Sequence, residues 1–465
     1  MTNAVASYLP ECQVITLKPH LNAFCDPKNL RGFIGPSQIS FFFHEWLHYL
    51  HNVSTLHGLT AFANQVALWE EFRHTIAFDG LSAGSASLPA ARSQVIRQQL
   101  NYLSGSRAQK QNSLPEVLDV QLLRIVDVRP EVTMLEDLEI GLTSLVCDSE
   151  FTHCDGSISR VNLKIGTNEL LESLAAMLEA QLVTQLGGHE TPAPVVPYHL
   201  LTVLARWRAP RLTDREVTCC GLAALQSSDP LGILLSLLDI GEVARDEGKN
   251  SLLELRKAAT TALTELYVWR EKTLARIEAA FPIDEPLARA IKQTVAVFRK
   301  NFVERARNPF FEYDVVADLV RDVQRMDNAI KTYGGCSVIQ ECLGDPDMPN
   351  RDFMYEFAFG VPDELLDLGW RKMHASFRFV TLHASKEGFS STDSLDASRR
   401  TRCPFYRVCG YPLRTSAPYV CACTPWKSVA LVGKGETTPC WYSEAVHDLR
   451  PPAAGVVDET MPIDG

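Results

Sequence analysis

One apolar stretch, residues 35–58, limits what this 465-residue chain can fold into more than any other part of it. It contains an H-E-x-x-H pattern at residues 44–48, and the apolar residues around the pattern recur at steps of three and four. This spacing predicts a helix whose apolar stripe packs into a core. On such a helix His44 and His48 lie one turn apart on the same face, so both imidazoles can reach one metal ion.

The flanking residues suggest where this helix begins and ends. Pro36 suits the first turn, and Gly58 suits the exit. Glu45 is rotated just off the histidine pair, where it can hold a metal-bound water without being a ligand. The alternative is a pair of histidines satisfied within the core, but burying two imidazoles and a carboxylate without partners is costly. The pattern therefore favours a metal site with Glu45 as the catalytic base.

The composition excludes several other classes of protein. Hydrophobic residues make up 46% and charged residues 22% of the chain, as in ordinary globular proteins. The net charge of −11 argues against nucleic acid or an anionic membrane as the main partner. The first residues lack the basic start and apolar run of a signal peptide, and the longest apolar run, 231–238, is too short to span a bilayer. Thirteen scattered cysteines fit a reducing compartment, so we expect a cytoplasmic protein.

The order of strand and helix signals predicts an α+β fold that is predominantly α-helical. Strand-like and helical segments are mixed in residues 1–210, which we expect to form one domain around the H-E-x-x-H helix. Residues 211–345 read as an antiparallel helical array without a fixed repeat. Residues 346–465 are rich in Pro, Gly, Cys and aromatic residues, and we expect an irregular C-terminal region there.

Two histidines do not complete a catalytic zinc site, which uses three protein ligands and a water molecule. The metzincin pattern requires Gly seven residues and His ten residues after the first His, but here His51 and Ser54 occupy those positions. That class is excluded. His51 lies about 10.5 Å along the helix axis from His44, so it suits the substrate cleft or the surroundings of the ligands better than the metal.

A carboxylate from a second helix can supply the third ligand. Residues 160–165 alternate between apolar and polar types, which predicts a half-buried strand, and residues 168–186 read as the helix after it. Glu172, at the border of that helix's apolar stripe, is the best candidate, followed by Glu169 and then Glu179. The preceding strand could be a sheet edge that pairs with an extended peptide.

These two segments resemble the gluzincin group of zinc metallopeptidases. The run GTNELLESLA, residues 166–175, is similar to the glutamate helix of bacterial members, in which Ala commonly follows the ligand glutamate by three residues. Glu172 and Ala175 match that spacing, although the Asn-Glu pair that ends at Glu169 resembles thermolysin-like enzymes. The run HEWLHYLHNVSTLHGL, residues 44–59, further resembles uncharacterised bacterial HExxH proteins.

The resemblance implies a zincin-like metallopeptidase core in residues 1–210. We therefore expect a zinc metallopeptidase with His44, His48 and Glu172 (alternatively Glu169) as ligands of one catalytic Zn²⁺. The ion would activate water, and Glu45 would move its proton to the leaving amine. Three residues after the glutamate helix are candidates for a donor to the oxyanion: Tyr198, His199 and His189. A protein or peptide, specifically a cytoplasmic protein partner, is the expected substrate. Two alternatives stay open: a scaffold protein with a structural or degenerate metal site, and a zinc hydrolase acting on a non-peptide bond.

Five cysteines near the C-terminus form a second group. They are Cys403, Cys409, Cys421, Cys423 and Cys440. Their number within a short stretch suggests a structural zinc site of four thiolates with one cysteine left over. The spacing is not the C-x2-C of common zinc knuckles, so buried thiols without a metal are the alternative, and an iron–sulfur cluster is a weaker one.

Overall fold

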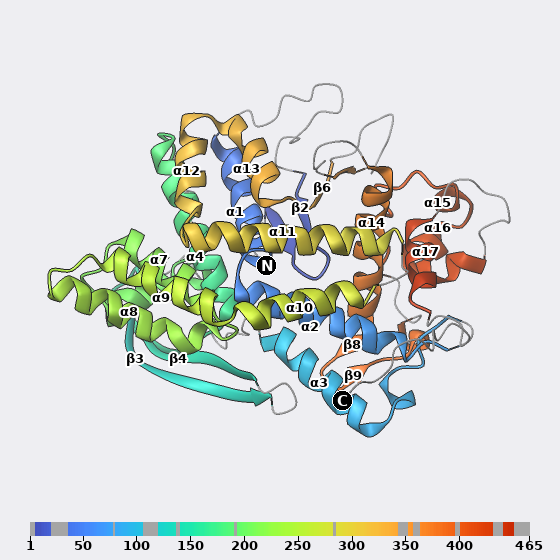
Figure 1. The fold of residues 1–465 in the computed structure, drawn as a ribbon, viewed down its shortest axis with the longest axis horizontal. Helices are drawn as coiled ribbons and strands as arrows, with labels where there is room; N and C mark the ends of the chain where they lie inside the picture. The colour runs from blue at the N-terminus through green and yellow to red at the C-terminus, as the bar shows by residue number, and fades with distance from the viewer. Residues whose placement is uncertain are drawn as a thin grey trace.

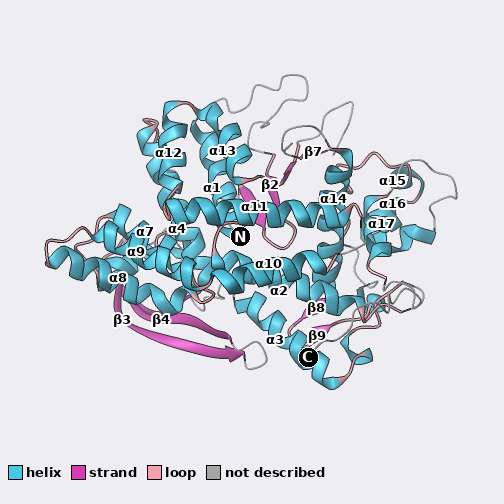
Figure 2. Ribbon diagram, in the orientation of Figure 1, coloured by secondary structure: helices cyan, strands magenta, loops and turns pink. Residues whose placement is uncertain are grey.

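A computed structural model gives the fold (Figures 1 and 2). It describes residues 5–19, 36–77, 80–105, 120–135, 140–189, 193–281, 285–342, 352–356, 363–395, 400–430 and 440–450. The protein is a mixed α+β fold in which helices predominate, as the sequence predicts. Helices α10 and α11 cross the middle of the molecule, a long β-ribbon flanks one side, and the last helices lie at the opposite side (Figure 1).

The strands form three separate sheets. The first has the order β1-β2-β6-β7, with β1 and β2 antiparallel and β2 and β6 parallel. The second is an antiparallel sheet in the order β3-β4-β5, and the third is the pair β8-β9. The bounds are β1 Ala6–Leu9, β2 Val14–Leu17, β3 Val120–Leu135, β4 Ile140–His153, β5 Ile158–Ile165, β6 Ser337–Gln340, β7 Phe353–Tyr355, β8 Ala384–Ser385 and β9 Gly388–Phe389.

Helices dominate each part of the chain. The first six are α1 Pro36–Asn52, α2 Leu56–Arg73, α3 Ala90–Gly105, α4 Thr167–Gln185, α5 Val195–Tyr198 and α6 Leu200–Arg208. The array that follows is α7 Asp214–Ala224, α8 Pro230–Asp246, α9 Ser251–Glu265, α10 Tyr267–Ala279, α11 Leu287–Arg307, α12 Glu312–Arg321 and α13 Met326–Tyr333. The last are α14 Glu364–His383, α15 Leu413–Ser416, α16 Pro418–Cys423 and α17 Trp441–Asp448. Short 3₁₀ turns occupy Ser85–Ser87, Val323–Arg325, Thr392–Leu395 and Pro425–Ala430.

The helix that carries the H-E-x-x-H pattern is shorter than predicted, because the chain turns after Asn52. A new helix begins at Leu56, and the Thr55 hydroxyl caps it by accepting a hydrogen bond from the Gly58 N–H at 3.0 Å. Gly58 therefore starts α2 rather than ending α1. A Cβ at Gly58 would lie 2.1 Å from the backbone oxygen of Asn52, so glycine is required by the close approach of the two helices at this corner.

The end of α1 is fixed by residues far along the chain. Asn301 on α11 donates to the Val53 carbonyl at 3.2 Å, and Arg305, one turn later, donates to the Ser54 carbonyl at 3.0 Å. Within α1, the Trp46 indole donates to the Gly334 carbonyl at 3.0 Å. These bonds satisfy buried backbone oxygens that have no other place to find a donor, and they hold α1 against the helical array.

The C-terminal region is more regular than the sequence suggests. The twenty-residue α14 lies inside it and packs against α11 and α17. In the sequence, the interior glycine Gly369 weakens the helical pattern of this segment. In the structure, a Cβ at Gly369 would lie 2.4 Å from the Pro286 carbonyl oxygen, so the glycine allows two backbones to approach closely. Within the helical array, α9 ends before Leu266 and α12 ends before Asp322, and in each case another helical segment follows directly.

A continuous buried cluster joins all three predicted regions. It includes Val14 from the first, Leu234 from the second and Phe377 from the third. The predicted division at residues 210 and 345 stays a prediction, since burial alone does not define separately folding units. Among the described residues, no helix combines the length and apolar character needed to cross a membrane.

Candidate metal centre

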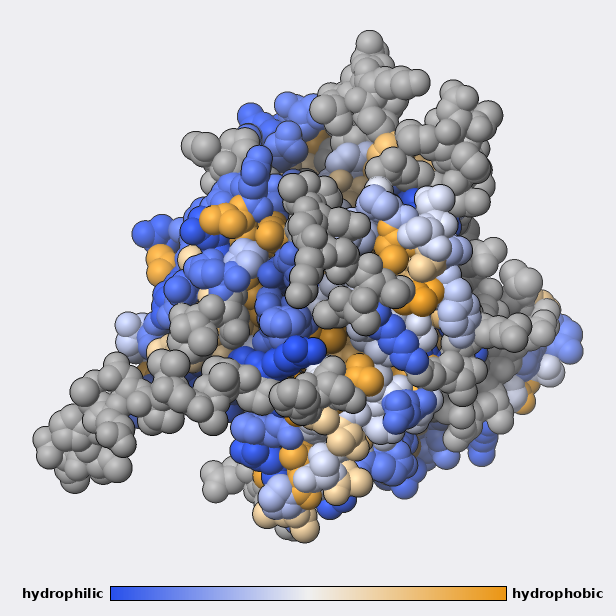
Figure 3. All heavy atoms as spheres, turned by 90° about the vertical axis from the view of Figure 1, so that its right-hand side faces the viewer, coloured by the Kyte–Doolittle hydropathy of each residue, from blue (hydrophilic) through white to orange (hydrophobic). Residues whose placement is uncertain are grey.

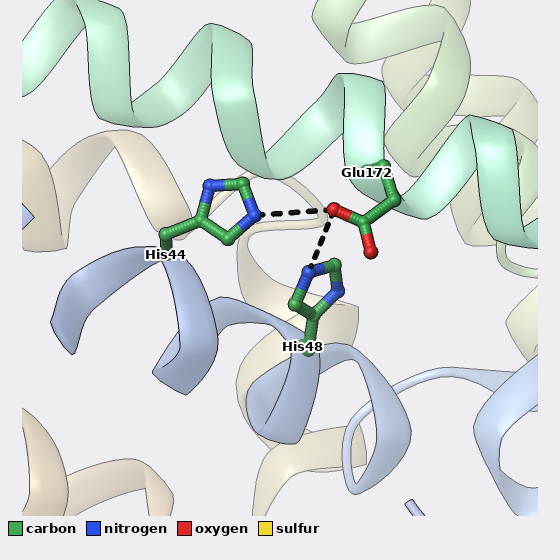
Figure 4. A group of neighbouring side chains, drawn as sticks. All are labelled: His44, His48 and Glu172. Carbon is green, nitrogen blue, oxygen red and sulfur yellow. Dashed lines mark hydrogen bonds and ion pairs between the residues drawn. The ribbon is translucent and has the colours of Figure 1, made fainter. Parts of the chain in front are cut away.

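The antiparallel face between α1 and α4 brings three predicted ligands together (Figure 4). Nε2 of His44 lies 3.3 Å and Nε2 of His48 lies 3.5 Å from Oε2 of Glu172. All three ligand atoms lie within 4.8 Å of one another. Ligands bonded at about 2.0–2.1 Å to a tetrahedral zinc ion are about 3.3 Å apart, so the residues present fit such an ion with little movement.

The neighbouring glutamates have other roles. Oε2 of Glu169 accepts a hydrogen bond from the Gly166 N–H at 2.9 Å and so caps the start of α4. Glu179, two turns after Glu172, contacts Nδ1 of His44 at 2.8 Å. That contact fixes which ring nitrogen of His44 carries the proton and leaves Nε2 directed at the metal position. Of the three candidate glutamates, Glu172 is the one that belongs, with His44 and His48, to the group that could hold a metal ion.

The electrostatics of the centre follow from carboxylates around a buried imidazole. Burial lowers the pKa of His44, but hydrogen bonds with Glu172 and Glu179 outweigh it and raise the pKa to about 10. Burial acts to raise the pKa of Glu172, but the two histidines hold it well below its usual range. Without a metal, His44 is thus protonated at neutral pH, and a bound metal would replace that proton.

Glu45 lies beside the ligands without belonging to the group of ligand atoms within 4.8 Å. Glu45 is 8% exposed, and it lines a cavity of about 400 Å³ together with His48 and Glu172. Burial raises the pKa of Glu45, as do Glu172 and Glu179, while His44 and His48 lower it. A carboxyl group with a raised pKa next to a metal position is suited to accept and release a proton near neutral pH.

Tyr198 is placed as a donor, whereas the other two candidates are not. Its ring lies 5.9 Å from that of His44, centroid to centroid, and it lines the cavity. Burial raises its pKa to about 12, helped by Glu172, Glu45 and Glu179, so its hydroxyl keeps its proton. His199 follows α5 and precedes α6, and it is exposed, as is His189. Neither histidine lines the cavity within the described residues.

The edge strand that reaches the cavity is β1 rather than the predicted strand. β5 does form the outer strand of its sheet, but none of its residues line the cavity. Tyr8 and Leu9, in β1, do so, and β1 is the outer strand of the first sheet. The segment ASYL is too short to stand out in the sequence. The position of β1 at the cavity is fixed by its pairing with β2, which the sequence does not reveal.

A buried polar group forms another part of the cavity wall. His51 lines the cavity, as expected from its position on α1, and its Nε2 lies 3.4 Å from Oε1 of Glu312. Arg305 binds Glu312 through two nitrogen atoms, at 3.0 and 2.5 Å, and both side chains are fully buried. Burial lowers the pKa of His51 despite Glu312, so this histidine is a neutral group in the wall.

Comparison with known proteins adds no relative. No family model matches the chain, and no curated protein or solved structure matches it. The geometry of α1, α4 and the cavity that they line is therefore what points to a function.

Proposed function

We propose that this protein is a zinc-dependent metallopeptidase with a zincin-like core. The observation that carries the proposal is the set of His44, His48 and Glu172 at tetrahedral spacing, with Glu45 beside it in a cavity. Three protein ligands from two helices and an adjacent carboxylate are typical of catalytic rather than structural zinc sites. A structural site would have four protein ligands and no need for the cavity.

The residues take distinct roles in the proposed reaction. Zinc, when bound, would lower the pKa of a water molecule and polarise the scissile carbonyl. Glu45 accepts a proton from the attacking water and donates it to the leaving amine. The Tyr198 hydroxyl, which stays protonated, donates a hydrogen bond to the oxygen that becomes negatively charged. Glu179 holds His44 in the orientation that presents Nε2.

The position of β1 supports a peptide as the substrate. Its residues line the cavity, and within the described chain it pairs through one edge only, with β2. An extended peptide can add to such an edge through main-chain hydrogen bonds. We propose that the substrate is a specific protein partner whose extended segment enters along β1.

Cleavage of a peptide library by the wild type and by Glu45→Gln tests the proposal. We expect the substitution to reduce the cleavage rate by about 10²–10⁴-fold, because the proton transfer is lost. Zinc content, measured by mass spectrometry of the purified protein, should be unchanged, because Glu45 is not a ligand.

Two results would contradict the proposal. One is an undiminished cleavage rate in Glu45→Gln. The other is zinc content that does not fall in the double variant His44→Ala with His48→Ala, which would favour a scaffold protein with its metal elsewhere. Glu254→Gln, on the exposed face of α9, is the matched control for removing one carboxylate and should leave cleavage unchanged.

A further inference from the structure

Four of the five C-terminal cysteines come from three segments that meet beside α14 and α17. Cys403 and Cys409 lie in one loop, Cys421 lies in α16, and Cys440 immediately precedes α17. The backbone N–H of Cys403 donates to the carbonyl of Ala422, which fixes the loop against α16. The thiols of Cys409, Cys421 and Cys440 pack with the small apolar group formed by Tyr411 and Leu413.

The same four cysteines are near neighbours. Cys403 lies near Cys421, Cys440 and Cys409, and Cys421 lies near Cys440 and Cys409, close enough for a charge on one sulfur to affect the others. Cys423 follows Cys421 by two residues, and side chains two positions apart on a helix point in nearly opposite directions. The fifth cysteine is thereby directed away from the place where the others meet.

Two of the sulfur atoms receive backbone hydrogen bonds of the same kind. The Tyr411 N–H donates to Sγ of Cys409 at 3.3 Å, and the Phe405 N–H donates to Cys403. In each case the donor is the second residue after the cysteine. Amide donors directed at sulfur favour a negative thiolate over a neutral thiol, and thiolates are the form that binds metal. The loop that carries both cysteines thus directs one amide at each sulfur, although burial raises the pKa of the Cys403 thiol.

We propose that Cys403, Cys409, Cys421 and Cys440 bind a structural zinc ion, independently of the catalytic centre. The donor set is four thiolates, which closes a tetrahedral zinc site and leaves no position for substrate. Sulfur atoms bonded to such an ion at about 2.3 Å are about 3.8 Å apart. In the described chain no three of them lie within 4.8 Å of one another, so binding draws the three segments together.

The surroundings explain why a metal is needed here. α15 and α16 have only four and six residues, too few for stable isolated helices. The small cluster around Tyr411 and Leu413 is separate from the main core. On the side of the molecule that carries α15 to α17, hydrophobic side chains form only small scattered groups (Figure 3). Phe405 and α17 belong to the main core, but the short segment of α15 and α16 has only this small cluster, and such segments are commonly held by a metal or a disulfide.

Zinc analysis of matched variants tests the site. We expect about two zinc ions per wild-type chain. The double variant that combines Cys409→Ser and Cys421→Ser should hold about one zinc ion per chain. His44→Ala with His48→Ala should also retain about one, and Cys423→Ser about two. A cysteine double variant with the zinc content of the wild type would overturn the proposal. If the wild type holds one ion that only the cysteine variant loses, the structural site stands and the catalytic centre fails.

Cobalt substitution gives a second readout that needs no variant to fold. Co²⁺ bound by thiolates absorbs strongly through sulfur-to-metal charge transfer, whereas a site of two histidines and one glutamate cannot produce that band. We expect the band in cobalt-loaded wild type and in His44→Ala with His48→Ala. Its absence from cobalt-loaded wild type would overturn the thiolate site, whatever the peptidase assay shows.

Discussion

At the scale of residues, His44 is the most constrained group in the centre. One ring nitrogen faces Glu172 and the other faces Glu179, so two of the three carboxylates of α4 act through the same imidazole. Glu172 and Glu179 are seven residues apart, which places them on one face of the helix. In the proposed centre the arrangement separates two tasks, since Glu172 would supply a ligand atom and Glu179 would orient a ligand.

Removal of Glu179 should weaken metal binding without removing a ligand. We expect Glu179→Ala to lower zinc affinity by about 10–100-fold, because the partner that orients His44 is lost. Competition with a chromogenic chelator measures the affinity. Glu169→Ala is the control on the same helix: it removes the helix cap and should lower stability, but its zinc affinity should equal that of the wild type. Unchanged affinity in Glu179→Ala would show that His44 is held by other contacts.

The sequence allowed part of this centre to be predicted. His44, Glu45 and His48 belong to one local pattern, and their geometry follows from helical spacing alone. Glu172 could not be separated from Glu169 and Glu179 in the same way, because residues three and seven apart share a helix face. The choice depends on a hydrogen bond to the Gly166 N–H and on the position of α1, and neither can be read from composition or periodicity.

At the scale of elements, Glu216 connects the starts and ends of three helices. It accepts hydrogen bonds from Thr213, the N-cap of α7, from Arg245 on α8 and from Ser251 on α9. Burial acts to raise its pKa, but these donors lower the pKa to about 2. α7 in turn packs against α4, so this junction supports the helix that carries Glu172.

The junction should make stability depend on pH in a defined direction. The pKa of Glu216 lies near 2 in the folded protein and near 4.5 in the unfolded chain. Its contribution is therefore complete above about pH 4.5 and is lost as the pH falls toward 2. We expect Glu216→Gln to reduce the free energy of unfolding by about 1–2 kcal/mol at pH 7.

Urea unfolding of wild type and Glu216→Gln at pH 7 and pH 3 measures this effect. The difference in the free energy of unfolding between the two proteins should shrink at the lower pH, because the Glu216 carboxylate of the wild type then becomes protonated and stabilises the fold less. Glu254→Gln, which removes an exposed carboxylate on α9, should show little effect at either pH. A difference that grows at pH 3 would contradict the assigned direction.

Individual elements differed in how well the sequence predicted them. α4 shows regular apolar spacing, and it was predicted close to its observed bounds. α14 was missed because Gly369 interrupts its pattern, yet that glycine serves a contact with Pro286 from a distant segment. The prediction that the first helix ends at Gly58 was wrong for the same physical reason. In both cases a glycine that reads as a local break is required by tertiary packing.

At the scale of the whole molecule, Arg305 and Glu312 form a fully buried ion pair that joins distant parts of the chain. Arg305 also donates to Ser54 at the end of α1, and Glu312 faces His51 in the cavity wall. Burial acts to raise the pKa of Glu312, but Arg305 and His51 lower it to about 2. The pair thus links the helical array to the helix of the metal centre.

Neutralising one member of the pair should be strongly destabilising. We expect Glu312→Gln to lower the free energy of unfolding by about 3–5 kcal/mol, because the buried Arg305 charge loses its partner. Urea unfolding at pH 7 provides the measurement. Glu304→Gln is the control, since it removes a carboxylate from an exposed pair with Arg307 and should change stability by less than about 1 kcal/mol. Equal stabilities for the two variants would show that Arg305 finds compensation elsewhere.

The bonds that hold α1 also determine when the centre can be complete during synthesis. All three candidate ligands have been made by the end of α4 at Gln185, but the partners of Val53, Ser54 and Trp46 are residues 301, 305 and 334. β2 pairs with the cavity strand β1 on one side and with β6, residues 337–340, on the other. This sheet can therefore be completed only after β6 has been made. During synthesis the candidate ligand residues therefore emerge well before the segments that hold α1 in place, so the candidate metal centre can be completed only after most of the chain has been made.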